Sequence, residues 1–244
     1  MKIIGHRGAR NEAPENTVEG FIHAQRNGCQ HFELDIQLSA DKELMVYHDK
    51  TLKRTSGLNQ KLSQLSCSQL ASIDSRLNTP GWGSPCYISS LETIFLAVPD
   101  THSWQFEVKT DRRDSLTIIL DKLATFIKVH DLYDKCHVTS TNKWFLKKLK
   151  LKNPKIETGF VCEFLYQRPV QSCSDIGASL LALNEKLASK KIVATAEAAN
   201  IEVSCWTVND IPRIDHLVSL GIESIITDHP TTMIAQYIQN VNLK

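Results

Sequence analysis

The chain has 244 residues, close to the upper limit for one hydrophobic core and sufficient for one closed α/β barrel of roughly 250 residues. Apolar residues make up 42% and charged residues 23% of the chain, a composition that excludes an intrinsically disordered protein. Lysine and arginine total 28 against 27 acidic residues, and the formal net charge of +1 argues against a general nucleic-acid-binding protein.

Seven cysteines are spread along the chain, at positions 29, 67, 86, 136, 162, 173 and 205. Their odd number and the lack of any Cys-x-x-Cys pair in the sequence indicate buried thiols in a reducing compartment, not a disulfide framework or a thiolate zinc site. The N-terminus lacks the ~7–15-residue apolar stretch of a secretory signal, and no apolar run approaches the ~18 residues that span a bilayer. We therefore expect a soluble, cytoplasmic protein without a transmembrane segment; the sequence indicates no oligomeric state.

Short apolar runs alternate with helical periodicity along nearly the whole chain. The runs predict eight strands, at residues 2–6, 31–37, 104–109, 136–140, 156–162, 179–183, 202–208 and 223–227. Eight strands, each followed by a helix, are the number that a (β/α)₈ or TIM barrel requires. An open doubly wound sheet is the alternative, but the first strand is not followed by the Gly-x-Gly-x-x-Gly motif typical of that fold.

Three amphipathic segments carry the clearest helical pattern. The first covers residues 18–25 and ends at Gly28. The second has its apolar side chains on one face, at positions 116, 119, 120, 123, 126 and 127. The third covers residues 211–218, with Asp210 as the expected N-cap and Gly221 just past its end.

The alternation is interrupted between the second and third predicted strands, where no strand–helix unit of normal length fits. This interval contains the turn-rich stretch Asn78–Pro85 and ends at Ser89–Glu92, a capping box that predicts a short helix through Val98. Loops longer than ~15 residues are uncommon, and several apolar residues here are available to pack: Leu62, Leu65, Leu70, Ile73 and Trp82. We interpret residues 50–88 as a small folded insertion over the barrel mouth, within a single domain of residues 1–244.

Two acidic residues, Glu33 and Asp35, flank Leu34 in the second predicted strand. Alternate side chains of a strand share one face, so both carboxylates point the same way while Leu34 points toward the helices. A third acid, Glu107, lies at the end of the next strand. Like charges inside a barrel are costly unless a cation neutralises them, and carboxylate oxygens suit Mg²⁺ or Ca²⁺. The acids therefore predict either a divalent metal site or a set of salt-bridged side chains.

Two of the nine histidines end apolar runs. His6 closes the first strand in Gly5–Gly8, where glycines allow a ligand to approach the backbone closely. His48 follows the apolar run Leu44–Tyr47 and precedes Asp49, whose carboxylate can orient the imidazole ring. Because histidine can donate or accept a proton near neutral pH, the two form a candidate acid–base pair. We expect the remaining histidines to be structural or exposed: His23, His31, His102, His130, His137, His216 and His229.

Two cations accompany these residues. Arg7 follows His6, and Lys109 shares a strand face with Glu107. Both could be simple ion-pair partners, but together with a divalent metal they would form a positive pocket suited to a phosphate. The sequence has no P-loop, no His-Glu-x-x-His and no Gly-x-Ser-x-Gly, which argues against a P-loop nucleotidase, a common zinc hydrolase and a serine hydrolase.

These residues form part of an ordered series of short motifs. The series is Gly5–Gly8, Pro14–Thr17, Glu33–Asp35, His48–Asp49, Arg54–Thr55, Glu107–Lys109, Trp206–Asn209 and Thr227–Pro230. It runs from residue 3 to about 230 and resembles the glycerophosphodiester phosphodiesterase family. The resemblance implies a TIM barrel with a small insertion after the second strand. It also implies hydrolysis of a small-molecule glycerophosphodiester to sn-glycerol 3-phosphate and an alcohol.

The resemblance further implies roles for the candidate residues. One divalent cation, Mg²⁺ or Ca²⁺, is expected at Glu33, Asp35 and Glu107, with His6 and His48 as general acid and base. The substrate would contact Arg7, Lys109 and Trp206, although Trp206 could equally pack in the core.

Departures from the family pattern fall at Ser140–Asn142 and Leu183–Glu185, which bear on the choice of alcohol. Three alternatives stay open at the level of sequence. They are a metal-free phospholipase C-like barrel acting on inositol lipids, a lysophospholipase D activity, and a catalytically silent barrel that binds phosphodiesters.

Overall fold

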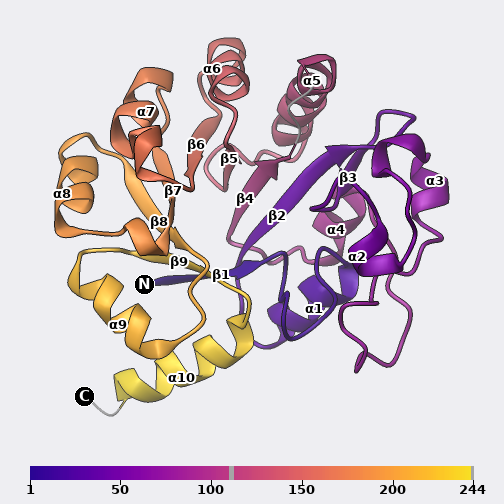
Figure 1. The fold of residues 1–244 in the computed structure, drawn as a ribbon, viewed down its shortest axis with the longest axis horizontal. Helices are drawn as coiled ribbons and strands as arrows, with labels where there is room; N and C mark the ends of the chain where they lie inside the picture. The colour runs from indigo at the N-terminus through magenta and orange to yellow at the C-terminus, as the bar shows by residue number, and fades with distance from the viewer. Residues whose placement is uncertain (110–112, 243–244) are drawn as a thin grey trace.

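The computed structural model describes residues 1–109 and 113–242. Within this part of the chain, eight parallel strands form a closed barrel with helices around it (Figure 1). The strands are β1 (Lys2–His6), β2 (His31–Leu38), β4 (Ser103–Val108), β5 (Cys136–Ser140), β6 (Glu157–Cys162), β7 (Leu180–Asn184), β8 (Glu202–Trp206) and β9 (Ser224–Thr227). Because β1 pairs with both β2 and β9, the sheet closes, and the fold is the predicted TIM barrel, not an open doubly wound sheet.

Side chains along each barrel strand alternate between the interior and the surrounding helices. In β2, Phe32 and Leu34 belong to the main hydrophobic core, whereas Glu33 and Asp35 are buried on the opposite face. Aromatic rings fill much of the core beside β2 and β4; the Phe21 and Phe32 centroids lie 5.2 Å apart. The apolar faces therefore fix the strands against the helices and leave polar residues for the barrel interior.

A helix follows each barrel strand, as predicted, except β2, which is followed by a further strand. These helices are α1 (Val18–Arg26), α5 (Arg113–Val129), α6 (Lys143–Lys152), α7 (Pro169–Ile176), α8 (Lys190–Ala198), α9 (Ile211–Ser219) and α10 (Pro230–Asn242). The expected caps of α9 are confirmed: the Asp210 side chain accepts a hydrogen bond from the Arg213 backbone N–H, and Gly221 has φ +93°. Glycine tolerates this left-handed conformation without the steric cost of a side chain.

One strand was not predicted. β3 (Leu44–Val46) extends the sheet by pairing antiparallel with the C-terminal half of β2. Three residues are too few to show the alternation by which a strand is recognised. β3 places the following residue pair, His48 and Asp49, beside the end of β2, because the Tyr47 backbone N–H donates to the Asp35 carbonyl at 2.9 Å.

The interval between β3 and β4 folds into short helices and turns. It contains α2 (Lys53–Ser56), the 3₁₀ helix η1 (Leu62–Gln64), α3 (Cys67–Leu70) and α4 (Leu91–Ala97), which lie on one side of the barrel (Figure 1). A second, smaller hydrophobic cluster holds this region together: Met45, Tyr47, Leu52, Leu62, Leu70 and Ile88. The capping of α4 differs by one residue from the expected box, since Ser90 is the N-cap and accepts from the Thr93 backbone N–H.

In residues 1–109 and 113–242, the structure has no helix with the combined length and apolar character needed to cross a membrane.

Candidate active site

Three carboxylates meet at the C-terminal ends of two adjacent strands. Glu33 and Asp35 come from β2 and Glu107 from β4, and the register pairs Asp35 directly with Glu107. One oxygen from each side chain lies within 4.8 Å of the others, and Glu33 and Asp35 are buried. The buried Glu33 Oε1 has no hydrogen-bond partner in the described part of the chain. An all-oxygen donor set with an unpartnered buried oxygen fits a hard divalent cation.

The neighbouring cations stabilise the charged form of Asp35 more than that of Glu33. Burial raises the pKa of Glu33 well above its usual range, and repulsion from Asp35 and Glu107 adds to this effect. Burial alone would also raise the pKa of Asp35, but the nearby Arg7 and Lys109 hold it well below the usual value. A cation among the three carboxylates would offset the repulsion that disfavours the charged form of Glu33.

His6 is fixed by a carboxylate from the far end of the sequence. Its Nδ1 lies 2.6 Å from Asp228 Oδ1, just after β9, and its Nε2 lies 3.9 Å from Glu33 Oε2. Burial would raise the pKa of Asp228, but the hydrogen bond and positive charge of His6 lower it to about 2. Burial of His6 lowers the pKa of its imidazole in spite of Asp228. The pairing at Nδ1 leaves Nε2 as the ring nitrogen available for proton transfer.

His48 has the same kind of partner. Its Nδ1 lies 2.6 Å from Asp49 Oδ1, the orientation that the sequence suggested. The turn that carries both residues is held by Gln37 of β2, whose side-chain N–H groups lie 2.8–2.9 Å from the carbonyl oxygens of Tyr47, His48 and Asp49. Gln37 follows Glu33 and Asp35 at a spacing of two on the same strand face, so β2 positions both the acids and the His48 turn.

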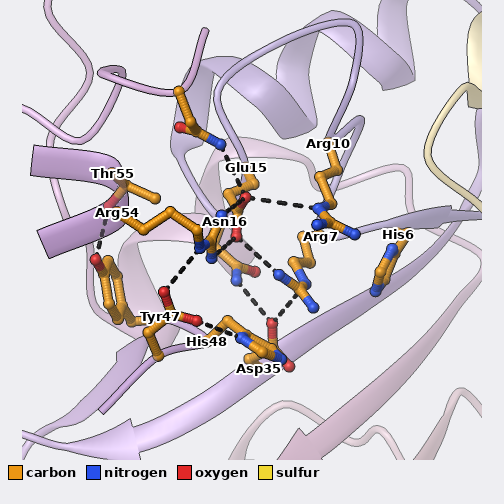
Figure 2. A network of polar contacts seen from close by, with 12 residues as sticks. His6, Arg7, Arg10, Glu15, Asn16, Asp35, Tyr47, His48, Arg54 and Thr55 are labelled. Atoms are coloured by element: carbon orange, nitrogen blue, oxygen red, sulfur yellow. Dashed lines mark hydrogen bonds and ion pairs between the residues drawn. The ribbon is translucent and has the colours of Figure 1, made fainter. Parts of the chain in front are cut away.

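Arg7 and Lys109 lie against the acids. Arg7 has φ +53° and donates its backbone N–H to Glu33 Oε2 at 3.1 Å, while its Nε lies 3.1 Å from Asp35 Oδ2. Lys109 Nζ lies 2.6 Å from Glu107 Oε1 and 3.4 Å from Asp35 Oδ1. Figure 2 shows Arg7 directed toward Asp35 from the loop after β1. Both cations are therefore ion-pair partners of the cluster as well as candidates for phosphate contact.

A cavity of about 170 Å³ opens at this end of the barrel. Seven of the eight candidate residues line it, namely His6, Arg7, Glu33, His48, Glu107, Lys109 and Trp206. The eighth, Asp35, lies behind them in the carboxylate cluster. Trp206 ends β8, and its indole N–H donates to the Ala182 carbonyl at 3.0 Å, which fixes the ring at the cavity wall. The structure thus brings all the predicted site residues to one end of the barrel.

Some residues of the site were not assigned a function from sequence. Asp228 holds His6, Gln37 holds the His48 turn, and Asn16 donates its side-chain N–H to Asp35 Oδ2 at 2.9 Å. Asn16 and Asp228 lie within motifs noted above, yet a motif does not show which side chain a residue contacts. For Gln37 the signal was its position two residues after Asp35 in the same strand.

A closed parallel barrel that carries acids, histidines and cations at the C-terminal ends of its strands defines an enzyme of the TIM-barrel class. The model of the glycerophosphoryl diester phosphodiesterase family matches residues 6–232. The chain belongs to this family and is a phosphodiesterase.

Similar proteins agree with this assignment. The chain is 24% identical over 235 residues to a glycerophosphodiester phosphodiesterase of Caldanaerobacter subterraneus subsp. tengcongensis, covering 95% of this chain and 96% of that protein. It is 24% identical to a lysophospholipase D of Rattus norvegicus, covering 98% and 86% of the two chains. An Oleispira antarctica phosphodiesterase, solved with the product sn-glycerol-3-phosphate, superposes with a TM-score of 0.88 at 20% identity, covering 96% of each chain.

Proposed function

We propose that this protein hydrolyses glycerophosphodiesters to sn-glycerol 3-phosphate and an alcohol, with a divalent cation, Mg²⁺ or Ca²⁺, and with His6 and His48 as general acid and base. One observation carries the proposal: two histidines, each paired with an aspartate through Nδ1, line the same cavity as the carboxylate cluster. The activities of the similar proteins support it.

The chain's cations and acids have distinct roles in binding. Glu33, Asp35 and Glu107 would hold the cation, which supplies positive charge that polarises the phosphodiester. Arg7 contacts the non-bridging phosphate oxygens, because its guanidinium lies at the cavity and its planar fork of N–H donors suits a pair of phosphate oxygens. Lys109 holds Glu107 in place and adds a second positive charge beside the phosphate.

Proton transfer takes place at Nε2 of the two histidines. One histidine accepts the proton of the attacking hydroxyl group, which belongs to water or to the substrate itself. The other donates a proton to the alcohol oxygen as its bond to phosphorus breaks, so the alcohol leaves neutral. The aspartate at each Nδ1 fixes the ring orientation and stabilises the imidazolium form. Trp206 provides an apolar wall for the glycerol carbons.

The test is a panel of glycerophosphodiesters incubated with the purified protein, with and without EDTA, and assayed for glycerol 3-phosphate. We expect release of glycerol 3-phosphate, its loss with EDTA, and its recovery on addition of Mg²⁺ or Ca²⁺. Glu33→Gln should raise the cation concentration needed for half-maximal activity, because one ligand charge is removed. Turnover that is indifferent to EDTA would support the metal-free alternative, and no turnover at all would leave only a binding protein.

A lysophospholipase D activity is the second candidate, favoured by one surface feature. Phe164, Leu165 and Tyr166 are 49%, 59% and 79% exposed, and they directly follow Glu163, which lines the cavity. Adjacent exposed apolar side chains of this size at a cavity mouth are suited to an acyl chain. The test compares glycerophosphocholine with lysophosphatidylcholine. Replacing all three side chains by serine should lower kcat/KM for the lipid alone; an equal effect on both substrates contradicts this candidate.

We further propose a single domain, residues 1–244, in which residues 50–88 form a folded insertion at the cavity mouth. The small hydrophobic cluster beside β3 supports an insertion with its own core. Limited proteolysis of the native protein should yield no stable fragment that ends inside the barrel, because the barrel closes between β1 and β9.

We also propose a cytoplasmic location. The seven free cysteines support it, because free thiols suit a reducing compartment.

A further inference from the structure

Glu15 is a buried carboxylate that lies among three guanidinium groups. Its side chain is 2% exposed and comes from the loop between β1 and α1. Arg54 donates to both oxygens, with Nη1 at 2.5 Å from Oε2 and Nη2 at 2.8 Å from Oε1. Arg7 Nη1 lies 2.9 Å from Oε1, and Arg10 Nε lies 3.7 Å from Oε2 (Figure 2). Glu15 is therefore the shared partner of three cations.

Each guanidinium connects Glu15 to a different part of the site. Arg54 Nε lies 2.7 Å from Asp49 Oδ2, and Asp49 holds His48. This first connection joins the barrel loop to residues 50–88, because Arg54 lies in α2. It ends at one of the two histidines that we assign to proton transfer.

The second connection runs toward the other histidine. Arg10 Nη1 lies 3.6 Å from Asp228 Oδ1, the oxygen that is 2.6 Å from His6 Nδ1. The third runs through Arg7, whose Nε lies 3.1 Å from Asp35 Oδ2 in the carboxylate cluster. One carboxylate thus contacts three arginines, and these in turn contact the aspartate partners of both histidines and one acid of the cation site.

Glu15 acts through these neighbours and not on the substrate. Glu15 is not one of the described residues that line the cavity. Although burial would raise the pKa of Glu15, the hydrogen bonds of Arg54 and the charge of Arg7 hold it below the usual value, so the side chain is charged. Without that charge, the guanidinium groups of Arg7, Arg10 and Arg54 would repel one another with no shared anion between them.

We propose that Glu15 is a positioning residue that holds the two histidine–aspartate pairs and Arg7 in their working arrangement. Arg54 carries this coupling from the barrel to the segment of residues 50–88. The inference rests on the proposed function, since it assumes that both histidines transfer protons. Its chemistry is electrostatic: the charge of Glu15 fixes Arg54 and Arg10, and these in turn orient the aspartates.

The test uses the full-length protein with its cation and glycerophosphocholine. Glu15→Gln keeps the shape and removes the charge, and kcat should fall by about 10- to 100-fold, the usual range for such supporting partners. Arg54→Ala should lower kcat about tenfold with KM unchanged, because its guanidinium pairs, within residues 1–109 and 113–242, with the supporting carboxylates of Asp49 and Glu15. Glu15→Asp, which retains the charge, should recover part of the loss.

A matched control is Glu157→Gln. Glu157 also pairs with a basic side chain, that of Lys150 at 3.3 Å, but it lies at the N-terminal end of β6 and outside the described lining of the cavity. This variant should retain the wild-type kcat. If Glu15→Gln and Glu157→Gln folded equally well and had the same kcat, the proposal would be overturned. A rise in KM alone in Glu15→Gln would overturn it too, since this would restrict Glu15 to supporting Arg7.

A measurement without turnover separates this inference from the proposed function. In ¹⁵N-labelled protein, Arg54→Ala should disturb the Nδ1–H resonance of His48 and leave that of His6 unchanged. Arg10→Ala should do the reverse. If neither resonance changes in a folded variant, the coupling does not exist, whatever the enzyme hydrolyses. Arg54 is partly exposed, so its replacement tests the inference even if Glu15→Gln fails to fold.

Discussion

At the scale of single residues, the two histidines differ in environment but share one arrangement. His6 is buried beside β9, whereas His48 lies on a turn at the edge of the site, and each is held at Nδ1 by an aspartate. His6→Ala and His48→Ala should each lower kcat by roughly 10²–10⁴, the usual contribution of a positioned acid or base. Steady-state kinetics with glycerophosphocholine will measure this, and circular dichroism will check folding. A wild-type rate in either folded variant would contradict the assignment.

Asp228 gives a prediction about acid stability. The folded-state pKa of about 2 lies below the ordinary value of 3.8, so its charged form stabilises the fold. This contribution is complete above the unfolded-state pKa and is lost as pH falls toward 2; the shift corresponds to about 2 kcal/mol. Urea unfolding should therefore show a shallower loss of stability between pH 4 and pH 2 in Asp228→Asn than in the wild type. An equal dependence of stability on pH in the two proteins would show that the charge of Asp228 does not stabilise the fold.

The candidate side chains could be chosen from the sequence because strand ends of a parallel barrel meet at one rim. The residues that these side chains contact could not be predicted in this way. Asp228 is 222 residues from His6, and Arg54 is 39 residues from Glu15. Such contacts depend on the exact register and on side-chain rotamers, which no local pattern encodes.

At the scale of elements, β2 organises the site, because its interior face carries Glu33, Asp35 and Gln37 in succession. The eight barrel strands were predictable, because short apolar runs indicate strands that are buried against the surrounding helices. β3 escaped prediction because it has only three residues, and the α4 cap fell on Ser90 because adjacent serines compete for the same role.

The loop after β1 offers an element-scale test at Gly5. A Cβ at this position would lie 2.2 Å from the Gly8 carbonyl oxygen, a backbone atom that cannot move without shifting Arg7. Gly5→Ala should destabilise the protein by about 1–3 kcal/mol, as overpacking does, and should lower activity. Gly81→Ala is the matched control, because its Cβ would meet nothing within 4 Å. The test compares the thermal unfolding and the kcat/KM of both variants. If Gly5→Ala had the stability and activity of the wild type, the close contact between position 5 and the Gly8 carbonyl oxygen would be contradicted.

At the scale of the whole molecule, the barrel gathers residues from positions 6 to 228 at one rim. The fold class followed from counting strand–helix units, because that count leaves few other architectures. The shape of residues 50–88 did not follow, since short helices and turns without periodicity depend on tertiary contacts.

Closure between β1 and β9 has a consequence for synthesis. His6 precedes Asp228 by 222 residues and therefore leaves the ribosome well before it. Until β9 joins the barrel, the imidazole has no carboxylate to orient it, so the proposed His6–Asp228 pair forms only after β9 has paired with β1. Chains truncated before β9 would lack this pair, and we expect them not to hydrolyse glycerophosphodiesters.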